Sequence, residues 1–165
     1  MGEGTTVLVV DDEEPLRRVV RRALESEGCT ILEASDGEAA LRLLQEMESS
    51  PDLVLTDLRM PRVSGRELAE ILSVFRPDLP VIAMTGFAGS AHPDRRLPLL
   101  VKPFTKPVLV EAVKTARDRR GATPTMPRVE QRSRARRLRE IAENGGADVD
   151  LVTAVQLLRG LPDET

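Results

Sequence analysis

The sequence is poor in the residues that build many common functional sites. It contains one cysteine, Cys29, and one histidine, His92, among 165 residues. A single cysteine excludes an internal disulfide framework and a cysteine-rich zinc site. A single histidine excludes a histidine-rich metal site and catalysis by a pair of histidines. Carboxylates, hydroxyls and lysines are therefore the main side chains left for chemistry.

Aromatic residues and long apolar runs are also scarce. Three phenylalanines are the only aromatic residues, so we expect an aliphatic core and no aromatic platform for stacking nucleic-acid bases. No apolar run approaches the roughly 18 residues that a transmembrane helix needs, and the N-terminus lacks the pattern of a signal peptide. The net charge of −3 gives no general attraction to nucleic acid. We expect a cytoplasmic protein without a membrane anchor.

Five short apolar runs alternate with amphipathic segments over the first 120 residues. The runs lie at residues 7–10, 30–32, 53–55, 81–84 and 99–101. Helical spacing of apolar residues follows four of them, as in the segment from Leu16 to Leu24. This alternation predicts an α/β fold with a doubly wound five-stranded parallel sheet. The fourth connection, residues 86–98, contains two glycines and two prolines, so we expect at most one or two helical turns there.

The composition changes after residue 120. We expect residues 1–120 to form one domain, residues 121–127 a linker, and residues 128–165 a short helical extension of unknown role. The extension begins with six arginines: Arg128, Arg132, Arg134, Arg136, Arg137 and Arg139. Such a stretch can follow a nucleic-acid backbone. Acidic residues balance the basic ones over residues 121–165, and no helix-turn-helix pattern is present. We therefore favour a solvated amphipathic helix, with nucleic-acid binding as the alternative.

Charged and hydroxyl residues follow the apolar runs at their carboxyl ends. Asp11 and Asp12 follow the first run, Asp57 the third, Thr85 the fourth and Lys102 the fifth. In a doubly wound sheet these ends share one edge, where ligands bind. Carboxylates that gather without compensation repel one another, and a hard cation such as Mg²⁺ relieves the repulsion. A site with Mg²⁺, a lysine and a hydroxyl suits phosphoryl transfer, with Asp57 as the candidate nucleophile.

Five motifs occur in order along residues 5–120, each next to a predicted strand or helix. They are Val9-Val10-Asp11-Asp12-Glu13, Asp36-Gly37-Glu38-Ala39-Ala40-Leu41, Asp57-Leu58-Arg59-Met60-Pro61 with Gly65, Met84-Thr85-Gly86, and Val101-Lys102-Pro103-Phe104. Each motif alone is weak, but their order and their positions at matching strand ends are specific. Together they resemble the receiver domain of bacterial two-component response regulators, which has the flavodoxin-like fold also called CheY-like.

The resemblance implies a phosphoprotein of a phosphorelay, and it implies a role for each matching residue. Asp57 matches the phosphoacceptor, which takes its phosphoryl group from a sensor histidine kinase or a phosphotransfer protein. Asp12 matches a direct Mg²⁺ ligand, and Asp11 matches its partner, which often acts through water. Asp57 and the backbone carbonyl of Arg59 match the remaining protein ligands of the metal.

The resemblance also implies how the signal is formed. Lys102 matches the lysine that contacts the phosphate, and Thr85 matches the hydroxyl that moves toward the phosphoryl oxygen. Gly86 fits the small residue that leaves space beside it. The family implies a self-phosphorylating phosphoacceptor without turnover of a separate substrate, an unknown downstream protein target, and possible homodimers.

The sequence departs from the family at the side that reads out the signal. Leu99 occupies the position, three residues before Lys102, where the family usually has an aromatic residue. The segment from Thr85 to Lys102 is also shorter than usual. We therefore expect the protein either to signal through a rearranged fourth connection or to act largely as a phosphate sink.

Two alternatives belong to other functional classes. Phosphatases with an aspartyl nucleophile use a similar sheet, but they carry Asp-x-Asp after the first strand, whereas Asp11 and Asp12 are adjacent here. Turnover of p-nitrophenyl phosphate would favour that alternative. A nucleic-acid-binding regulator would instead use the arginine-rich stretch of residues 128–139, and salt-dependent DNA binding would favour it.

Overall fold

Five parallel strands form the centre of the fold, and they coincide with the five apolar runs of the sequence. The computed structural model describes residues 4–86, 97–120, 129–130, 132–133 and 136. The strands run in the spatial order β2-β1-β3-β4-β5. Their bounds are β1 (Thr6–Val10), β2 (Thr30–Ala34), β3 (Leu53–Asp57), β4 (Val81–Thr85) and β5 (Leu99–Val101).

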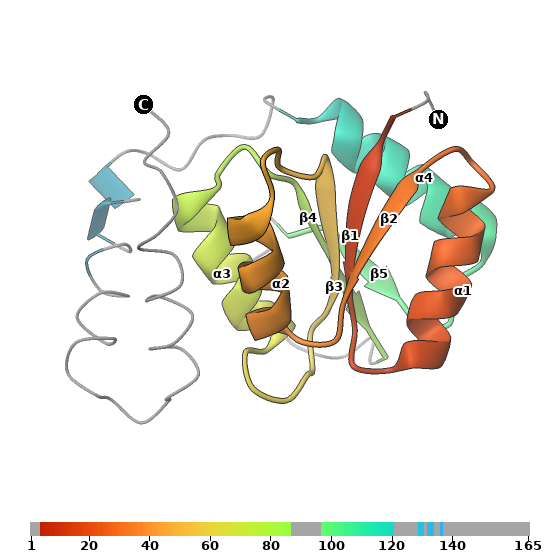
Figure 1. Cartoon of the computed structure of the whole chain (residues 1–165), viewed down its shortest axis with the longest axis horizontal. Helices are drawn as coiled ribbons and strands as arrows, with labels where there is room; N and C mark the ends of the chain where they lie inside the picture. The colour runs from red at the N-terminus through yellow and green to blue at the C-terminus, as the bar shows by residue number, and fades with distance from the viewer. Residues whose placement is uncertain (1–3, 87–96, 121–128, 131, 134–135, 137–165) are drawn as a thin grey trace.

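Helices cover both faces of the sheet. Figure 1 shows α1 and α4 on one side of the strands and α2 and α3 on the other. Their bounds are α1 (Glu14–Glu25), α2 (Gly37–Glu46), α3 (Gly65–Phe75) and α4 (Lys106–Asp118). The predicted doubly wound α/β fold is therefore confirmed. The helical turns predicted in the fourth connection fall on residues 87–96, outside the described residues.

Successive residues of β1 supply two separate cores. Val7 and Val9 pack with residues of α1 and α4, whereas Leu8 and Val10 pack with residues of α2 and α3. All four side chains are fully buried. Neighbouring residues of a strand point to opposite faces of the sheet. A strand covered on both faces is therefore apolar throughout, which explains the uninterrupted run.

Local signals fix where two of the helices begin. Asp36 precedes α2, and its carboxylate accepts a hydrogen bond of 2.8 Å from the backbone N–H of Ala39. Ser64 precedes α3 and forms a reciprocal capping box with Glu67. These caps satisfy backbone donors that a helix start leaves without intrahelical partners. They therefore fix the ends of the loops that connect β2 to α2 and β3 to α3.

The strand register brings the ends of the central strands to one edge. Val10 pairs with Thr56, Asp57 pairs with Met84, and Thr85 pairs with Val101. The chain leaves β1 toward β2 on one side and returns to β3 on the other, so the strand order reverses beside β1. In open parallel sheets ligands bind next to such a reversal, at the carboxyl ends of the strands.

Little of the C-terminal region belongs to the described residues. Residues 129–130, 132–133 and 136 are helical, and the side chain of Val129 is exposed. The predicted linker at 121–127 and the rest of the predicted extension lie outside the described residues. In the part of the chain that the structure covers, no helix has the length and apolar character needed to cross a membrane.

Candidate functional site

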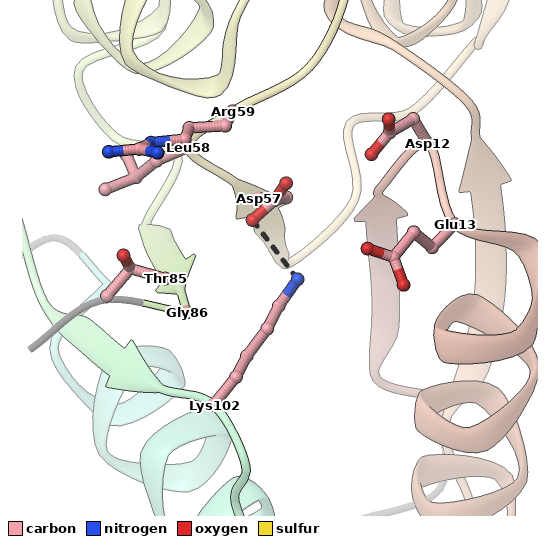
Figure 2. Close-up of a pocket in the computed structure, with 8 residues that line it drawn as sticks. All are labelled: Asp12, Glu13, Asp57, Leu58, Arg59, Thr85, Gly86 and Lys102. Atoms are coloured by element: carbon pink, nitrogen blue, oxygen red, sulfur yellow. Dashed lines mark hydrogen bonds and ion pairs between the residues drawn. The ribbon is translucent and has the colours of Figure 1, made fainter.

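Lys102 joins two aspartates that come from different strands. It follows β5, and its ammonium group donates to Asp11 Oδ2 at 3.1 Å and to Asp57 Oδ1 at 3.2 Å. Figure 2 shows the side chain reaching from the end of β5 to Asp57 at the end of β3. Residues 91 and 45 positions apart in the sequence thus meet at one edge of the sheet.

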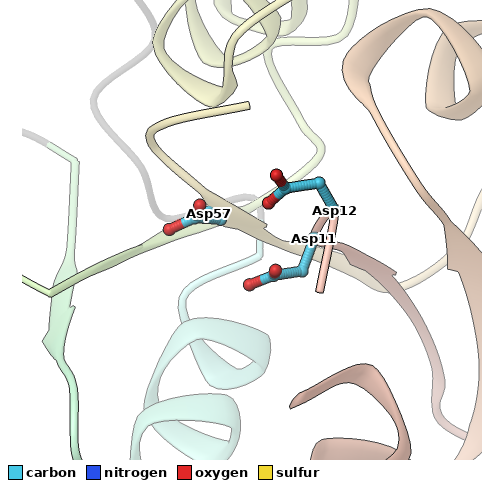
Figure 3. Close-up of side chains that lie close together, drawn as sticks. All are labelled: Asp11, Asp12 and Asp57. Carbon is cyan, nitrogen blue, oxygen red and sulfur yellow. The ribbon is translucent and has the colours of Figure 1, made fainter. Parts of the chain in front are cut away.

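Three carboxylates converge at this edge. Asp11 and Asp12 follow β1 and Asp57 ends β3, and each offers an oxygen within 4.8 Å of the others. Figure 3 shows the side chains of Asp11 and Asp12 directed toward the end of β3. Asp11 is fully buried, Asp57 is 8% exposed, and Asp12 is exposed. The group therefore has a buried side and a side open to solvent.

The backbone of the first loop holds Asp11 in place. The backbone N–H of Glu13 donates to Asp11 Oδ1 at 2.8 Å, while Lys102 binds the other carboxylate oxygen. The backbone N–H of Asp11 donates to the carbonyl of Ala34, at the end of β2, at 3.2 Å. Both carboxylate oxygens of this buried residue are thus satisfied, as a buried charge requires.

The carboxylates open into a pocket of about 250 Å³ at the edge of the sheet. Figure 2 shows Asp12 and Glu13 on one side of Asp57, and Arg59 and Thr85 on the other. The lining residues are Asp12, Glu13, Asp57, Leu58, Arg59, Thr85, Gly86 and Lys102. The structure therefore brings all the residues predicted from the strand ends to one place, Asp11 by its contact with Lys102.

The environment of the pocket disfavours the charged form of the Asp57 carboxylate. Burial raises the pKa of Asp57, and the charge of Asp11 adds to the effect, while the attraction of Lys102 offsets it only in part. Burial alone would lower the pKa of Lys102, but its hydrogen bonds and charge interactions with Asp11 and Asp57 outweigh burial and raise it. Lys102 is therefore a firmly charged cation next to a carboxylate that is not fully compensated.

The donor set suits a magnesium ion. Three aspartates against one lysine leave an excess of negative charge, which a divalent cation would balance. Mg²⁺ prefers oxygen ligands, and it commonly binds to one or two carboxylates and keeps several waters. The pocket is open on the side of the exposed Asp12 and has room for such waters. The residues present therefore fit Mg²⁺ by ligand type, by charge and by space.

A glycine allows α3 to begin directly against the backbone of Asp57. A Cβ atom on Gly65 would lie 1.7 Å from the carbonyl oxygen of Asp57, which is far below any van der Waals contact. The hydroxyl of Thr56 donates to the same carbonyl oxygen at 3.0 Å. The motif around Asp57 includes Gly65, but the sequence predicted no contact of this glycine with the site. The structure shows a close backbone approach, for which glycine is the suitable residue.

Two further pocket residues had no predicted role. Glu13 and Leu58 line the pocket, although the motifs that contain Asp11 and Asp57 include both of them. Their proximity in the sequence to the aspartates was the only available signal. Neither residue type distinguishes a lining position from an ordinary position in a loop.

The comparisons with known proteins agree with this geometry. The family model described as the response regulator receiver domain matches residues 7–114. The response regulator receiver protein CpdR of Brucella abortus is 37% identical over 102 residues, covering 61% of this chain and 83% of that protein. The sensor kinase CckA of the same organism is 36% identical over 114 residues, covering 66% of this chain and 12% of the kinase.

Solved structures are similar over the same region. A response regulator receiver domain protein from Clostridium thermocellum has a TM-score of 0.63 and 29% identity, covering 72% of this chain and 98% of that one. The response regulator TrrA from Thermotoga maritima, solved in complex with Mg²⁺–BeF, has a TM-score of 0.62 and 32% identity, with 68% and 98% covered.

The matches cover different shares of the length of each relative. The match spans most of CpdR but 12% of the length of CckA and 54% of the regulator PhoB from Pseudomonas aeruginosa. The shared part is thus the domain itself, alone or joined to others. The chain belongs to the family of response regulator receiver domains, the phosphoacceptor domains of two-component signalling.

Proposed function

We propose that Asp57 accepts a phosphoryl group from the phosphohistidine of a sensor histidine kinase or of a phosphotransfer protein. A carboxylate oxygen of Asp57 forms a bond to phosphorus, and the bond between phosphorus and the histidine nitrogen breaks. The electron pair of that bond stays on the imidazole, which takes up a proton. The product is an acyl phosphate on Asp57. The contact of Lys102 with both Asp11 and Asp57 is the observation that carries the proposal.

Lys102 has the position and the charge to hold the transferred group. Its ammonium lies 3.2 Å from Asp57 Oδ1, so a phosphoryl group on that side of Asp57 would meet a cation already in place. Negative charge on the phosphoryl oxygens in the transition state is stabilised by such fixed positive charge. Thr85 lines the same pocket, and we assign its hydroxyl to the phosphoryl group once that group is bound.

We assign the Mg²⁺ site to Asp11, Asp12, Asp57 and the backbone carbonyl of Arg59. The proximity of the three carboxylates supports the assignment, as does the position of Arg59 at the pocket. When bound, Mg²⁺ supplies positive charge that offsets the charge of the phosphoryl oxygens. On the buried side of the site, Asp11 binds Lys102. On the solvent side, the exposed carboxylate of Asp12 is accessible to the metal.

We also propose that the chain turns over no separate substrate. The only hydrolysis expected is slow loss of its own phosphoryl group from Asp57. The phosphatase alternative requires an Asp-x-Asp pair after β1, but Asp11 and Asp12 there are adjacent, and Asp11 is fully buried and bound to Lys102. We therefore expect no sustained release of p-nitrophenol from p-nitrophenyl phosphate, and steady turnover would contradict this part of the proposal.

We further propose that the receiver domain ends near residue 120, before a linker at 121–127 and a helical extension at 128–165. The end of α4 at Asp118 and the family match to residue 114 support this boundary. Brief digestion of the native protein with trypsin should release a stable fragment ending at Arg119, Arg120 or Arg128. Early cleavage within α1 or α2 instead would contradict the boundary.

Labelling with radioactive acetyl phosphate tests the proposed function. We expect the wild-type protein to take up label when Mg²⁺ is present and to lose this ability in a chelator. Asp57→Asn should abolish the label, because the amide is not a nucleophile for phosphorus. Asp118→Asn is the matched control, since it changes an aspartate that is 68% exposed on α4. Equal labelling of Asp57→Asn and wild type would contradict the proposal.

A further inference from the structure

Arg17 is bound to the peptide that connects two of the three carboxylate residues. Its Nη1 donates to the backbone carbonyl oxygen of Asp11 at 2.7 Å. That carbonyl belongs to the peptide bond between Asp11 and Asp12. The side chain of Arg17 is 15% exposed, so the guanidinium is largely withdrawn from solvent. A hydrogen bond from a charged donor in such a place is stronger than a neutral one.

Glu33 on β2 holds the guanidinium of Arg17 in position. The Nε atom of Arg17 lies 3.4 Å from Glu33 Oε1, and Glu33 pairs with Val9 of β1 in the sheet. The Nε atom is buried and has no hydrogen-bond partner among the described residues. The pairing with Glu33 is thus electrostatic, whereas the bond to Asp11 is a directed hydrogen bond. Arg17 therefore connects α1, the turn after β1, and β2.

We propose that Arg17 is a positioning residue that sets the affinity of the site for Mg²⁺. By holding the Asp11 carbonyl, Arg17 restricts rotation of the Asp11–Asp12 peptide. The exposed carboxylate of Asp12 then stays within ligand distance of Asp11 and Asp57. Arg17 touches neither the metal nor the phosphoryl group in this role. The inference rests on the proposed assignment of Mg²⁺ to these carboxylates.

Charge and geometry predict opposite effects for the removal of Arg17. Loss of a cation near the site would by itself strengthen the binding of Mg²⁺, because the remaining field is more negative. Loss of a residue that orients a ligand weakens metal binding, commonly by about 10-fold to 100-fold. The sign of the change in affinity therefore separates the two roles. The proposal predicts weaker binding.

Arg21 provides a matched control on the same helix. It forms ion pairs with Glu33 at 3.0 Å and with Glu25 at 2.8 Å, and its side chain is 48% exposed. Arg21→Ala thus removes a cation and a Glu33 contact from α1, as Arg17→Ala does. The described contacts of Arg21 do not include the Asp11 carbonyl. Only Arg17→Ala is expected to affect the metal site.

Titration of Mg²⁺ into the full chain, followed by the amide signals of residues 11–13 in two-dimensional NMR, tests the proposal. We expect the dissociation constant of Arg17→Ala to rise by about 10-fold and that of Arg21→Ala to stay within about 2-fold of wild type. Arg17→Lys keeps the charge but lacks the planar fork, so its constant should rise by an intermediate amount. It also serves as the test variant if Arg17→Ala gives the spectrum of an unfolded chain.

Labelling by acetyl phosphate at saturating Mg²⁺ provides the second readout. If Arg17 only positions the metal ligands, Arg17→Ala should approach the wild-type rate once Mg²⁺ saturates the site. Unchanged or tighter Mg²⁺ binding by Arg17→Ala would overturn the inference, as would equal weakening by Arg21→Ala. Absence of saturable Mg²⁺ binding by the wild type would instead overturn the proposed metal site. The two failures are thus distinguishable.

Discussion

Lys102 contacts two aspartates, and each contact has a different consequence for the proposed function. It binds the buried Asp11 and the proposed phosphoacceptor Asp57 through the same ammonium group. The contact with Asp11 neutralises a charge that is fully withdrawn from water. The contact with Asp57 places a cation where charge is expected to develop on a transferred phosphoryl group. Removing Lys102 should therefore affect metal binding and phosphorylation in opposite directions.

We predict that Lys102→Ala slows labelling by acetyl phosphate roughly 100-fold to 1,000-fold at saturating Mg²⁺, the usual cost of losing one fixed donor to transition-state charge. The same variant should bind Mg²⁺ more tightly, because a competing cation has left the carboxylates. Labelling reactions quenched at a series of times measure the rate, and an NMR titration measures the affinity for Mg²⁺. Lys114→Ala on α4 is the control, and its labelling rate should equal that of wild type. A labelling rate for Lys102→Ala near that of wild type would contradict the assigned role.

The raised pKa of Asp57 has a consequence for stability. Burial, the main cause, disfavours the charged carboxylate in the folded protein, and the attraction of Lys102 does not fully compensate. A carboxyl group whose folded pKa lies above its unfolded value destabilises the fold at every pH above the folded pKa. This penalty disappears as the pH falls through the raised pKa toward the unfolded value. At neutral pH and without a bound metal, the charged Asp57 carboxylate therefore lowers the stability of the fold.

We predict that Asp57→Asn raises the melting temperature by a few degrees at neutral pH in a chelator. The asparagine oxygen can still accept a hydrogen bond from Lys102, while the buried charge is gone. The difference from wild type should narrow as the pH is lowered through the raised pKa of Asp57, and Mg²⁺ should stabilise wild type more than the variant. Thermal unfolding followed by circular dichroism measures this. A lower melting temperature for Asp57→Asn at neutral pH would contradict the account.

The start of α3 is fixed by its close approach to the end of β3. Gly65→Ala would place a methyl group 1.7 Å from the carbonyl oxygen of Asp57, so the helix or the strand end must shift. We expect a loss of roughly 1–3 kcal/mol in the free energy of unfolding, as for other overpacked sites. Urea denaturation measures it. A shift of the strand end would displace the backbone of Asp57, so we also expect slower labelling by acetyl phosphate.

Gly86 after β4 offers the matched control for this substitution. A Cβ atom on Gly86 would meet nothing within 4 Å. We therefore expect Gly86→Ala to change the free energy of unfolding by less than about 0.5 kcal/mol. Equal losses for the two variants would show that the cost at Gly65 does not come from the contact with Asp57.

The edge strand β5 is short and partly open to solvent. Leu99 and Val101 are 38% and 41% exposed, and the backbone N–H of Lys102 donates to the carbonyl of Thr85 at 2.7 Å. This bond connects the two strand ends that carry the proposed switch hydroxyl and the proposed phosphate-contacting lysine. We therefore expect a change at the phosphoryl site to pass from β4 to β5 through the backbone, without an aromatic side chain at position 99.

We predict that a beryllofluoride mimic of the phosphoryl group changes amide hydrogen exchange across residues 86–100. The expected change is slower exchange, because new contacts at Thr85 would stabilise the backbone at the end of β4. Mass spectrometry of peptic fragments measures it, with fragments of β2 as the internal control. Unchanged exchange across residues 86–100 despite tight binding of the mimic would contradict a rearranged fourth connection and favour a phosphate sink.

Taken as a whole, the fold was largely predictable because its signals are local and repetitive. Each strand is a short apolar run, and four of the five runs are followed by a turn and an amphipathic helix, so periodicity alone indicates the alternation. The site was predictable for a related reason. Parallel strands place their carboxyl ends at one edge, so Asp11, Asp57 and Lys102 had to lie near one another once the strands were identified.

The parts that could not be predicted depend on contacts between distant elements. Arg17 has the ordinary sequence context of a surface arginine on α1, and only the folded structure shows its bond to the Asp11 carbonyl. The approach of Gly65 to Asp57 is likewise a property of the packed molecule. The raised pKa of Asp57 results from burial, which the sequence does not quantify. Sequence patterns thus predict position, whereas packing determines geometry and charge.

Identification of the phosphorylated residue is the sharpest test of whether Asp57 is the phosphoacceptor. After reaction with acetyl phosphate and Mg²⁺, borohydride reduces an acyl phosphate of aspartate to homoserine, which tandem mass spectrometry locates in a peptide digest. We predict homoserine at position 57 alone, and none in a sample treated with chelator before the reaction. Homoserine at Asp11 or Asp12, or a stable phosphoryl group on Thr85 with position 57 unmodified, would contradict this prediction.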